Sequence, residues 1–98
     1  METVYYVYIL KSYIANKYYI GQTSDLERRI LYHNSGYSKF TKPGIPWELV
    51  YVENYRSRQL PVRREAELKK LKSRVMIEKI ISDQSSWNKK KTLLIIIR

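Results

Sequence analysis

The sequence predicts a small α+β domain in which helices flank a three-stranded antiparallel sheet. Three short stretches rich in β-branched and aromatic residues are typical of strands, and they cover Val4–Leu10, Tyr18–Gly21 and Trp47–Glu53. Helix-start signals and apolar residues at helical spacing follow the second and third stretches. The predicted order is therefore strand, strand, helix, strand, helix, helix, and 98 residues suffice for one such domain.

The first two predicted strands form a hairpin. Val4–Leu10 carries apolar or aromatic residues on both of its faces, as expected of a strand that is covered on both sides. Lys11–Lys17 contains Ser12 and Asn16 and is predicted to be the connecting loop. Tyr18–Gly21 follows as a short antiparallel partner.

A helix is predicted directly after the hairpin. Ser24 followed three residues later by Glu27 fits a capping box, and acidic residues suit the positive end of the helix dipole. Gly36 is predicted to end this helix in the left-handed conformation. The expected apolar side carries Leu26, Ile30 and Leu31.

Two more helices are predicted after the third strand, which is preceded by a loop at Tyr37–Pro46. Pro61 suits the first turn of a helix that runs to about Leu71. Ser73 can then cap the last helix. The side chains expected to pack from these two helices are Leu60, Leu68, Leu71, Met76, Ile77, Ile80 and Ile81.

The net charge of +10 is unevenly distributed. Residues 1–55 hold six Lys and Arg against five Asp and Glu, whereas residues 56–91 hold twelve against four. A concentrated positive field attracts polyanions, of which nucleic acid is the common one. The alternative is a charge that serves solubility alone. A membrane surface is disfavoured because the basic helices lack a bulky aromatic stripe.

The composition excludes several kinds of site. There is no cysteine, so neither a disulfide nor a thiolate zinc site can hold the fold, and one histidine cannot build a histidine-rich metal site. The first residues do not predict a secretory signal. The longest apolar run, Leu93–Ile97, is far shorter than the ~20 residues of a membrane helix. We therefore expect a cytoplasmic protein.

Polar residues that could act on a phosphodiester lie close together in the first third of the chain. Arg29 and His33 are four residues apart and should project from one side of a helix, while Arg28 should point elsewhere. The alternative is an ordinary solvated helix face. Tyr8 and Tyr19 lie on the paired strands and can approach as cross-strand neighbours, or they can simply pack. A phenol has a pKa of ~10, which the charge of Arg29 could lower.

Glu65 is a carboxylate within a strongly basic predicted helix. It can form an ion pair with Lys69, which would contribute only a few tenths of a kcal/mol. Alternatively it is a single ligand for Mg²⁺, which often takes one or two protein carboxylates together with substrate phosphate oxygens. Glu67 is the nearest rival but should point to another side of the helix.

With these residues in order, the chain resembles the GIY-YIG nuclease domain, in particular its small stand-alone bacterial members. Val7-Tyr8-Ile9 matches the first half of the family motif, with valine in place of glycine, and Tyr19-Ile20-Gly21 matches the second half. The family's arginine and histidine fall at Arg29 and His33, and its metal-binding glutamate falls at Glu65. The segment FTKPGIPWELVY resembles the loop and third strand of this subgroup. The resemblance extends roughly from residue 4 to residue 81.

The resemblance implies hydrolysis of a DNA phosphodiester with one divalent metal ion, Mg²⁺ or Mn²⁺. Tyr8 would act as general base on the attacking water, and Arg29 would stabilise charge on the phosphate. Tyr19 and His33 would orient or share protons. Glu65 would hold the metal near the leaving oxygen.

Two features depart from the family pattern. Many members carry an asparagine near the end of the domain; Asn88 and Asn54 are candidates here, and the role stays open. Residues 82–98 form a basic and then apolar extension to a nuclease-like domain at residues 1–81. The run Leu93–Ile97 could add a strand, cover a core face or mediate self-association.

The leading interpretation is a metal-dependent DNA endonuclease, acting on structured DNA in repair or processing. One alternative is a nucleic-acid-binding module with weak or no catalytic activity. The intact set of Tyr8, Tyr19, Arg29, His33 and Glu65 argues against it. A second alternative is an interaction protein that uses its C-terminal run.

Overall fold

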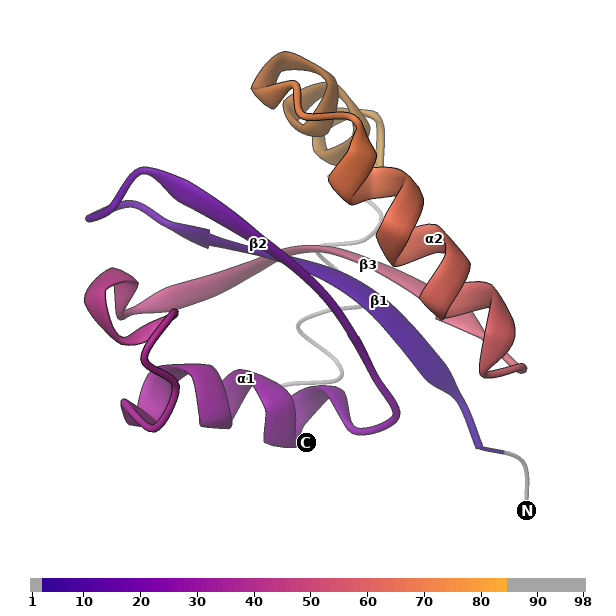
Figure 1. Ribbon diagram of the computed structural model, residues 1–98, viewed down its shortest axis with the longest axis horizontal. Helices are drawn as coiled ribbons and strands as arrows, with labels where there is room; N and C mark the ends of the chain where they lie inside the picture. Colours follow the sequence, from indigo (N-terminus) through magenta and orange to yellow (C-terminus); the bar gives the residue numbers. More distant parts are fainter. Residues whose placement is uncertain (1–2, 85–98) are drawn as a thin grey trace.

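The computed structural model describes residues 3–84 as a three-stranded antiparallel sheet with helices on both faces (Figure 1). The strands are β1 (Tyr5–Ser12), β2 (Lys17–Thr23) and β3 (Trp47–Tyr55), in the spatial order β2-β1-β3. The helices are α1 (Leu26–Ser35), the short 3₁₀ helix η1 (Lys42–Gly44) and α2 (Gln59–Lys70). A further helix runs from residue 74 to residue 84, the last residue described. The predicted α+β class and element order are confirmed.

The central strand β1 is covered on both faces, as its two-sided apolar pattern predicted. Tyr8 and Leu10 face the cluster that contains Leu26 of α1, whereas Val7 and Ile9 face the cluster that contains Leu68 of α2. Figure 1 shows α1 and α2 on opposite faces of the sheet. The sheet therefore separates two small cores, and β2 and β3 are its edge strands.

The hairpin is tighter than predicted. Pairing between β1 and β2 continues to Ser12 opposite Lys17, so only residues 13–16 remain in the turn. The predicted loop at Lys11–Lys17 was therefore too long. Asn16 adopts a positive φ of 54° in this turn, which asparagine tolerates better than most residues.

Helix α1 begins and ends close to the predicted positions, but its N-cap is Asp25 and not Ser24. The Asp25 side chain accepts a hydrogen bond from the backbone nitrogen of Arg28 at 3.2 Å. Gly36 follows the helix with a φ of 89°, which confirms the left-handed cap. Leu31 was wrongly expected to pack: it is 71% exposed, because it lies about 100° around the helix from Ile30.

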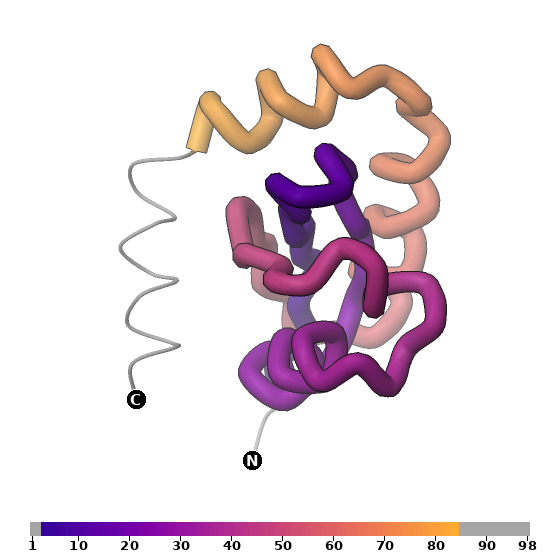
Figure 2. Tube along the Cα trace, turned by 90° about the vertical axis from the view of Figure 1, so that its left-hand side faces the viewer, coloured from indigo at the N-terminus to yellow at the C-terminus, as the bar shows by residue number. Residues whose placement is uncertain are grey.

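The later helices contribute fewer packed side chains than predicted. Leu68 and Ile77 are buried, but Leu60, Leu71 and Met76 are exposed. Met76, for example, lies about 100° around the last helix from the buried Ile77. Ser73 caps the last helix as predicted, accepting a hydrogen bond from the backbone nitrogen of Met76 at 3.3 Å. Figure 2 shows that this helix runs in a different direction from α2.

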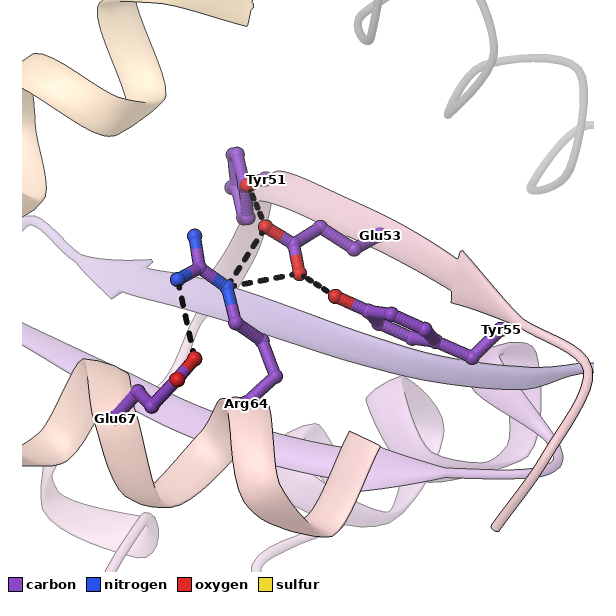
Figure 3. A network of polar contacts seen from close by, with 5 residues as sticks. All are labelled: Tyr51, Glu53, Tyr55, Arg64 and Glu67. Carbon is purple, nitrogen blue, oxygen red and sulfur yellow. Dashed lines mark hydrogen bonds and ion pairs between the residues drawn. The ribbon is translucent and has the colours of Figure 1, made fainter. Parts of the chain in front are cut away.

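A polar network joins α2 to β3 (Figure 3). Glu53 on β3 accepts hydrogen bonds from the hydroxyls of Tyr51 and Tyr55, and Arg64 on α2 donates to both carboxylate oxygens of Glu53 at 3.1 Å. Burial alone would raise the pKa of Glu53, but these three donors hold it below its ordinary value. Nη1 of Arg64 also lies 3.6 Å from Oε1 of Glu67, whereas Glu65 pairs with Lys69, so the two glutamates have different partners on α2.

The predictions for the C-terminal part of the chain concern residues on both sides of residue 84, the last residue described. The last described helix continues past residue 81, and the division of the chain into residues 1–81 and 82–98 stays a prediction. The Leu93–Ile97 run lies outside the described residues. No helix within residues 3–84 is long and apolar enough to cross a membrane.

Candidate active site

Tyr8 reaches across β2 because the residue opposite it is glycine. Tyr8 on β1 is paired with Gly21 on β2. A Cβ atom on Gly21 would stand 2.5 Å from the hydroxyl oxygen of Tyr8 and 2.6 Å from its Cζ. Any larger residue at position 21 would therefore collide with the phenol. The last position of the second motif tripeptide is explained by this close approach, which carries the Tyr8 hydroxyl toward the edge strand.

The hydroxyl of Tyr8 forms a buried hydrogen bond with His33 of α1. Its oxygen lies 3.0 Å from Nε2 of His33, and Nδ1 of His33 lies 3.3 Å from Oγ1 of Thr41. The Thr41 hydroxyl in turn donates to the backbone carbonyl of His33 at 3.5 Å. These partners assign one consistent arrangement, in which Nδ1–H donates to Thr41 and Nε2 accepts the phenol proton.

Burial sets the protonation of this pair. Burial lowers the pKa of His33 below 6.5, and the charge of Arg29 lowers it further, so the ring is neutral at neutral pH. Burial raises the pKa of Tyr8 well above its ordinary value, and Tyr19 and Glu65 add to the rise while Arg29 opposes it. Arg29 lowers the pKa of the phenol as expected, but burial outweighs the Arg29 charge, so the net shift of the Tyr8 pKa is upward.

Tyr19 completes a cluster of rings around this hydrogen bond. It pairs with Leu10 on β1 and so lies diagonally across from Tyr8, with ring centroids 6.3 Å apart. Its ring is 4.5 Å from that of His33 and 6.4 Å from that of Trp47. The predicted approach of the two tyrosines is confirmed, and both rings contact the one histidine.

Arg29 lies at the solvent-exposed side of this ring cluster, beside Tyr32. It is exposed, and its guanidinium lies 5.4 Å from the ring of Tyr32, which contacts His33. Within residues 3–84 no carboxylate forms an ion pair with Arg29, so its charge is available to an anion. Arg28 and Arg29 both line one surface hollow of about 300 Å³. The prediction that Arg28 points away from Arg29 is therefore only partly right. Of the two arginines, Arg29 is the one whose charge shifts the pKa values of Tyr8 and His33.

Glu65 lies on α2, within range of an electrostatic effect on the same phenol. Its side chain is 23% exposed, and its Oε2 atom lies 3.3 Å from Nζ of Lys69, so the ion pair considered from the sequence is present. The charge of Glu65 contributes to the raised pKa of Tyr8. The carboxylate and the Arg29 guanidinium therefore both act on Tyr8, although they come from helices on opposite faces of the sheet.

A metal ion would find one protein carboxylate here. No cluster of three or more His, Cys, Asp or Glu side chains that could hold a metal ion occurs within residues 3–84. Mg²⁺ keeps several waters and shares substrate phosphate oxygens, so a partly exposed Glu65 fits the role of a single protein ligand. Asn54 is exposed on β3, the strand at the far edge from β2, and Asn88 lies outside the described residues.

Sequence reasoning missed the residues that hold His33 in place. Thr41 is buried in the loop before β3, and the indole nitrogen of Trp47 donates to its carbonyl at 2.6 Å. Asn34 accepts from the backbone nitrogen of Trp47 at 2.7 Å and donates to its carbonyl at 3.1 Å. A threonine in a polar loop carries no pattern that marks it as a histidine partner, so no sequence signal could have found it.

Comparisons with known proteins agree with this arrangement. The family model described as the GIY-YIG catalytic domain matches residues 4–80. A UPF0213 protein of Streptococcus pneumoniae is 35% identical over 89 residues, which cover 90% of this chain and 88% of the relative. A UPF0213 protein of Natronomonas pharaonis is 36% identical over 86 residues, which cover 87% of this chain and 99% of that relative.

A solved structure is also similar. The solution NMR structure of a UPF0213 protein from Bacillus halodurans shares 35% sequence identity with this chain, with a TM-score of 0.57. The match covers 93% of this chain and 96% of that one. The family match at residues 4–80 includes Tyr8, Tyr19, Arg29, His33 and Glu65.

Proposed function

This chain belongs to the GIY-YIG family, and from that premise we propose that it is a metal-dependent endonuclease that hydrolyses DNA phosphodiester bonds. The observation that carries the proposal is the buried hydrogen bond of 3.0 Å from the Tyr8 phenol to a neutral His33, with the Arg29 charge beside it. We place its substrate among structured DNAs in repair or processing in the cytoplasm. The net charge of +10 favours a polyanionic substrate.

The raised pKa of Tyr8 determines how it can serve as a base. A free phenolate would be scarce at neutral pH, because burial disfavours the charged form. The phenol instead accepts a proton from the attacking water while its own proton passes to Nε2 of His33. The lowered pKa of His33 keeps that nitrogen unprotonated and ready to receive. Thr41 holds the ring in the orientation that this transfer needs.

Arg29 and Glu65 would stabilise the negative charge of the phosphate group, Arg29 directly and Glu65 through a bound metal ion. The exposed guanidinium of Arg29 can donate to two phosphate oxygens at once, which is worth most when negative charge builds up in the transition state. Glu65 would hold a Mg²⁺ or Mn²⁺ ion, which when bound supplies positive charge to the leaving oxygen. Tyr19 packs against both Tyr8 and His33 and limits the movement of their rings.

A second candidate is a nucleic-acid-binding module that cuts weakly or not at all. One observation favours it: Lys69 lies 3.3 Å from Glu65 and neutralises the carboxylate that a metal ion would use. Because Lys69 is more than half exposed, this pair adds little stability and is easily opened. The two candidates make different predictions for cleavage.

The deciding experiment is a cleavage assay on branched and linear DNA with Mg²⁺, with Mn²⁺ and with EDTA. We expect Tyr8→Phe, Arg29→Ala and Glu65→Gln each to lower the rate by about 10²–10³-fold, because each removes a group that acts in the transition state. Arg28→Ala and Glu67→Gln are matched controls one or two residues away, and they should retain cleavage.

Two results would count against the endonuclease. Equal cutting by the wild type and by all three site variants would identify a contaminating nuclease. Tight binding with no cutting, across branched and linear substrates and both metal ions, would favour the binding module.

A further inference from the structure

A second hollow lies along the edge strand, between β2 and the junction of α2 with the last helix. Its volume is about 480 Å³, within the usual range of roughly 300–1,000 Å³ for ligand pockets. Its apolar floor includes Ile20, Leu68 and Ile77. We call it the β2–α2 hollow. Its floor is built from β2, α2 and the last helix, which pack together in the core, and is therefore preformed.

The rim of the β2–α2 hollow is positively charged. Lys17, Lys69, Lys72 and Arg74 all line it. Lys69 is paired with Glu65, and Arg74 is paired with Glu78. Within residues 3–84, neither Lys17 nor Lys72 has a carboxylate partner. Two of the four cationic residues that line the hollow therefore have no ion-pair partner within residues 3–84.

The hollow is held at its outer end. Arg74 donates hydrogen bonds to the carbonyl and the side-chain oxygen of Asn16 in the β1–β2 turn, at 2.8 Å and 2.5 Å. Its guanidinium also lies 5.1 Å from the ring of Tyr18. These contacts tie the hairpin to the last helix, so the two walls of the hollow are joined directly.

The β2–α2 hollow is linked to the candidate active site through Lys69 of α2. Tyr19 also borders the hollow, but its ring packs with Tyr8 and His33 on the opposite, α1 face of the sheet, since side chains alternate along β2. Lys69 lines the hollow and forms the ion pair with Glu65. A nucleic acid bound at Glu65 would therefore meet the hollow along α2, beside Lys69.

Lys72 is held in an unfavourable backbone conformation. It lies between α2 and the last helix with a φ of 47°, in the left-handed region that glycine adopts without cost. The position after a helix is where glycine usually stands. A lysine there gives up some stability and places a long cation at the hollow. Strain of this kind is often found at functional sites.

We propose that the β2–α2 hollow binds an unpaired nucleotide of the substrate, so that the preferred DNA carries a single-stranded branch or end. Phosphate oxygens would meet Lys17 and Lys72, and the base would cover the apolar floor. A base within a duplex is stacked and paired, so it cannot enter the hollow. A fully paired DNA could contact the lysines through its phosphates but would place no base on the apolar floor. The charges of Lys17 and Lys72 disfavour a second copy of this basic chain as the occupant. This inference rests on the proposed function.

The test is a binding titration in EDTA, which removes cleavage from the measurement. Labelled forked DNA with a single-stranded arm and a fully paired duplex of equal length are compared by fluorescence anisotropy. We expect Lys72→Gly and Lys17→Ala to weaken binding to the fork several-fold and to the duplex little. Each should lower the slope of log affinity against log salt by about 0.7, the value for one lost phosphate contact on a single strand.

Lys70→Ala and Lys79→Ala are matched controls, because both are exposed lysines on the same two helices and neither lines the hollow. They should affect fork and duplex equally. Lys72→Gly should also melt at or above the wild-type temperature, since glycine relieves the left-handed strain. Weaker binding by a variant that is no less stable cannot come from a damaged fold.

A direct measurement places the ligand. On addition of a short oligothymidylate, the methyl signals of Ile20 and Ile77 should shift, while those of Leu49 and Val52 on the α1 face should not. The proposal is overturned if Lys72→Gly binds the fork as the wild type does, or loses fork and duplex affinity equally. A failure of the cleavage assay would instead remove the endonuclease and leave these binding results to stand alone.

Discussion

Substitution of Gly21 by alanine tests the central contact of the site. The added Cβ would lie 2.5 Å from the Tyr8 hydroxyl oxygen and 3.0 Å from its Cε2, far inside normal contact distance. Tyr8 is only 2% exposed and is bonded to His33, so its ring cannot move aside freely. Overpacking of a core typically costs about 1–3 kcal/mol, and loss of the buried hydrogen bond adds roughly 1 kcal/mol.

We therefore expect Gly21→Ala to lower the free energy of unfolding by about 2–4 kcal/mol, which corresponds to a fall in Tm of roughly 10–25 °C for a domain of this size. Urea unfolding and thermal melts measure this loss. Gly36→Ala is the control: no atom lies within 4 Å of its added Cβ, so only the positive φ should cost stability, by about 1 kcal/mol.

A double-mutant cycle separates the contact from any general effect. Tyr8→Leu removes the atoms with which the new Cβ collides, so Gly21→Ala should cost less in that background than in the wild type. Additive losses, or a Gly21→Ala variant within about 0.5 kcal/mol of the wild type, would refute the close approach as the reason for glycine.

Three further results are expected. The chain has a single histidine, so NMR titration of its ring reports His33 alone. Its pKa should lie below 6.5 and should rise in Arg29→Ala, because a neighbouring positive charge is removed. An unchanged pKa in Arg29→Ala would contradict the placement of Arg29. The pKa of Glu53 is lower in the folded state, so its contribution to stability is present above the unfolded pKa of 4.5 and is lost as the pH falls through the folded pKa. Urea unfolding between pH 3 and pH 7 should therefore show a smaller loss of unfolding free energy at low pH in Glu53→Gln than in the wild type. Asp25→Ala should destabilise the chain by about 1 kcal/mol and Ser24→Ala by much less, as measured by urea unfolding, and the reverse order would restore Ser24 as the cap.

Much of the fold could be predicted because local patterns agree with it. The apolar faces of β1 and the glycine after α1 depend on neighbours in sequence, and both predictions were confirmed. The errors arose where two residues compete for one role or where neighbouring apolar residues lie on different sides of one helix. Asp25 replaced Ser24 as the cap, and Leu31 and Met76 turned to solvent, because only the packed neighbours decide which flank of a helix is covered.

The sequence by itself determined the kinds of group available: two phenols, a guanidinium, an imidazole and a carboxylate at the spacing of a known motif. Only the tertiary structure decided their states. Burial, which depends on residues distant in sequence, raised the pKa of Tyr8 against the charge of Arg29 and kept His33 neutral. The same packing brought Thr41 to His33 and placed Lys72 beside the β2–α2 hollow, since contacts across a sheet leave no periodic trace along the chain.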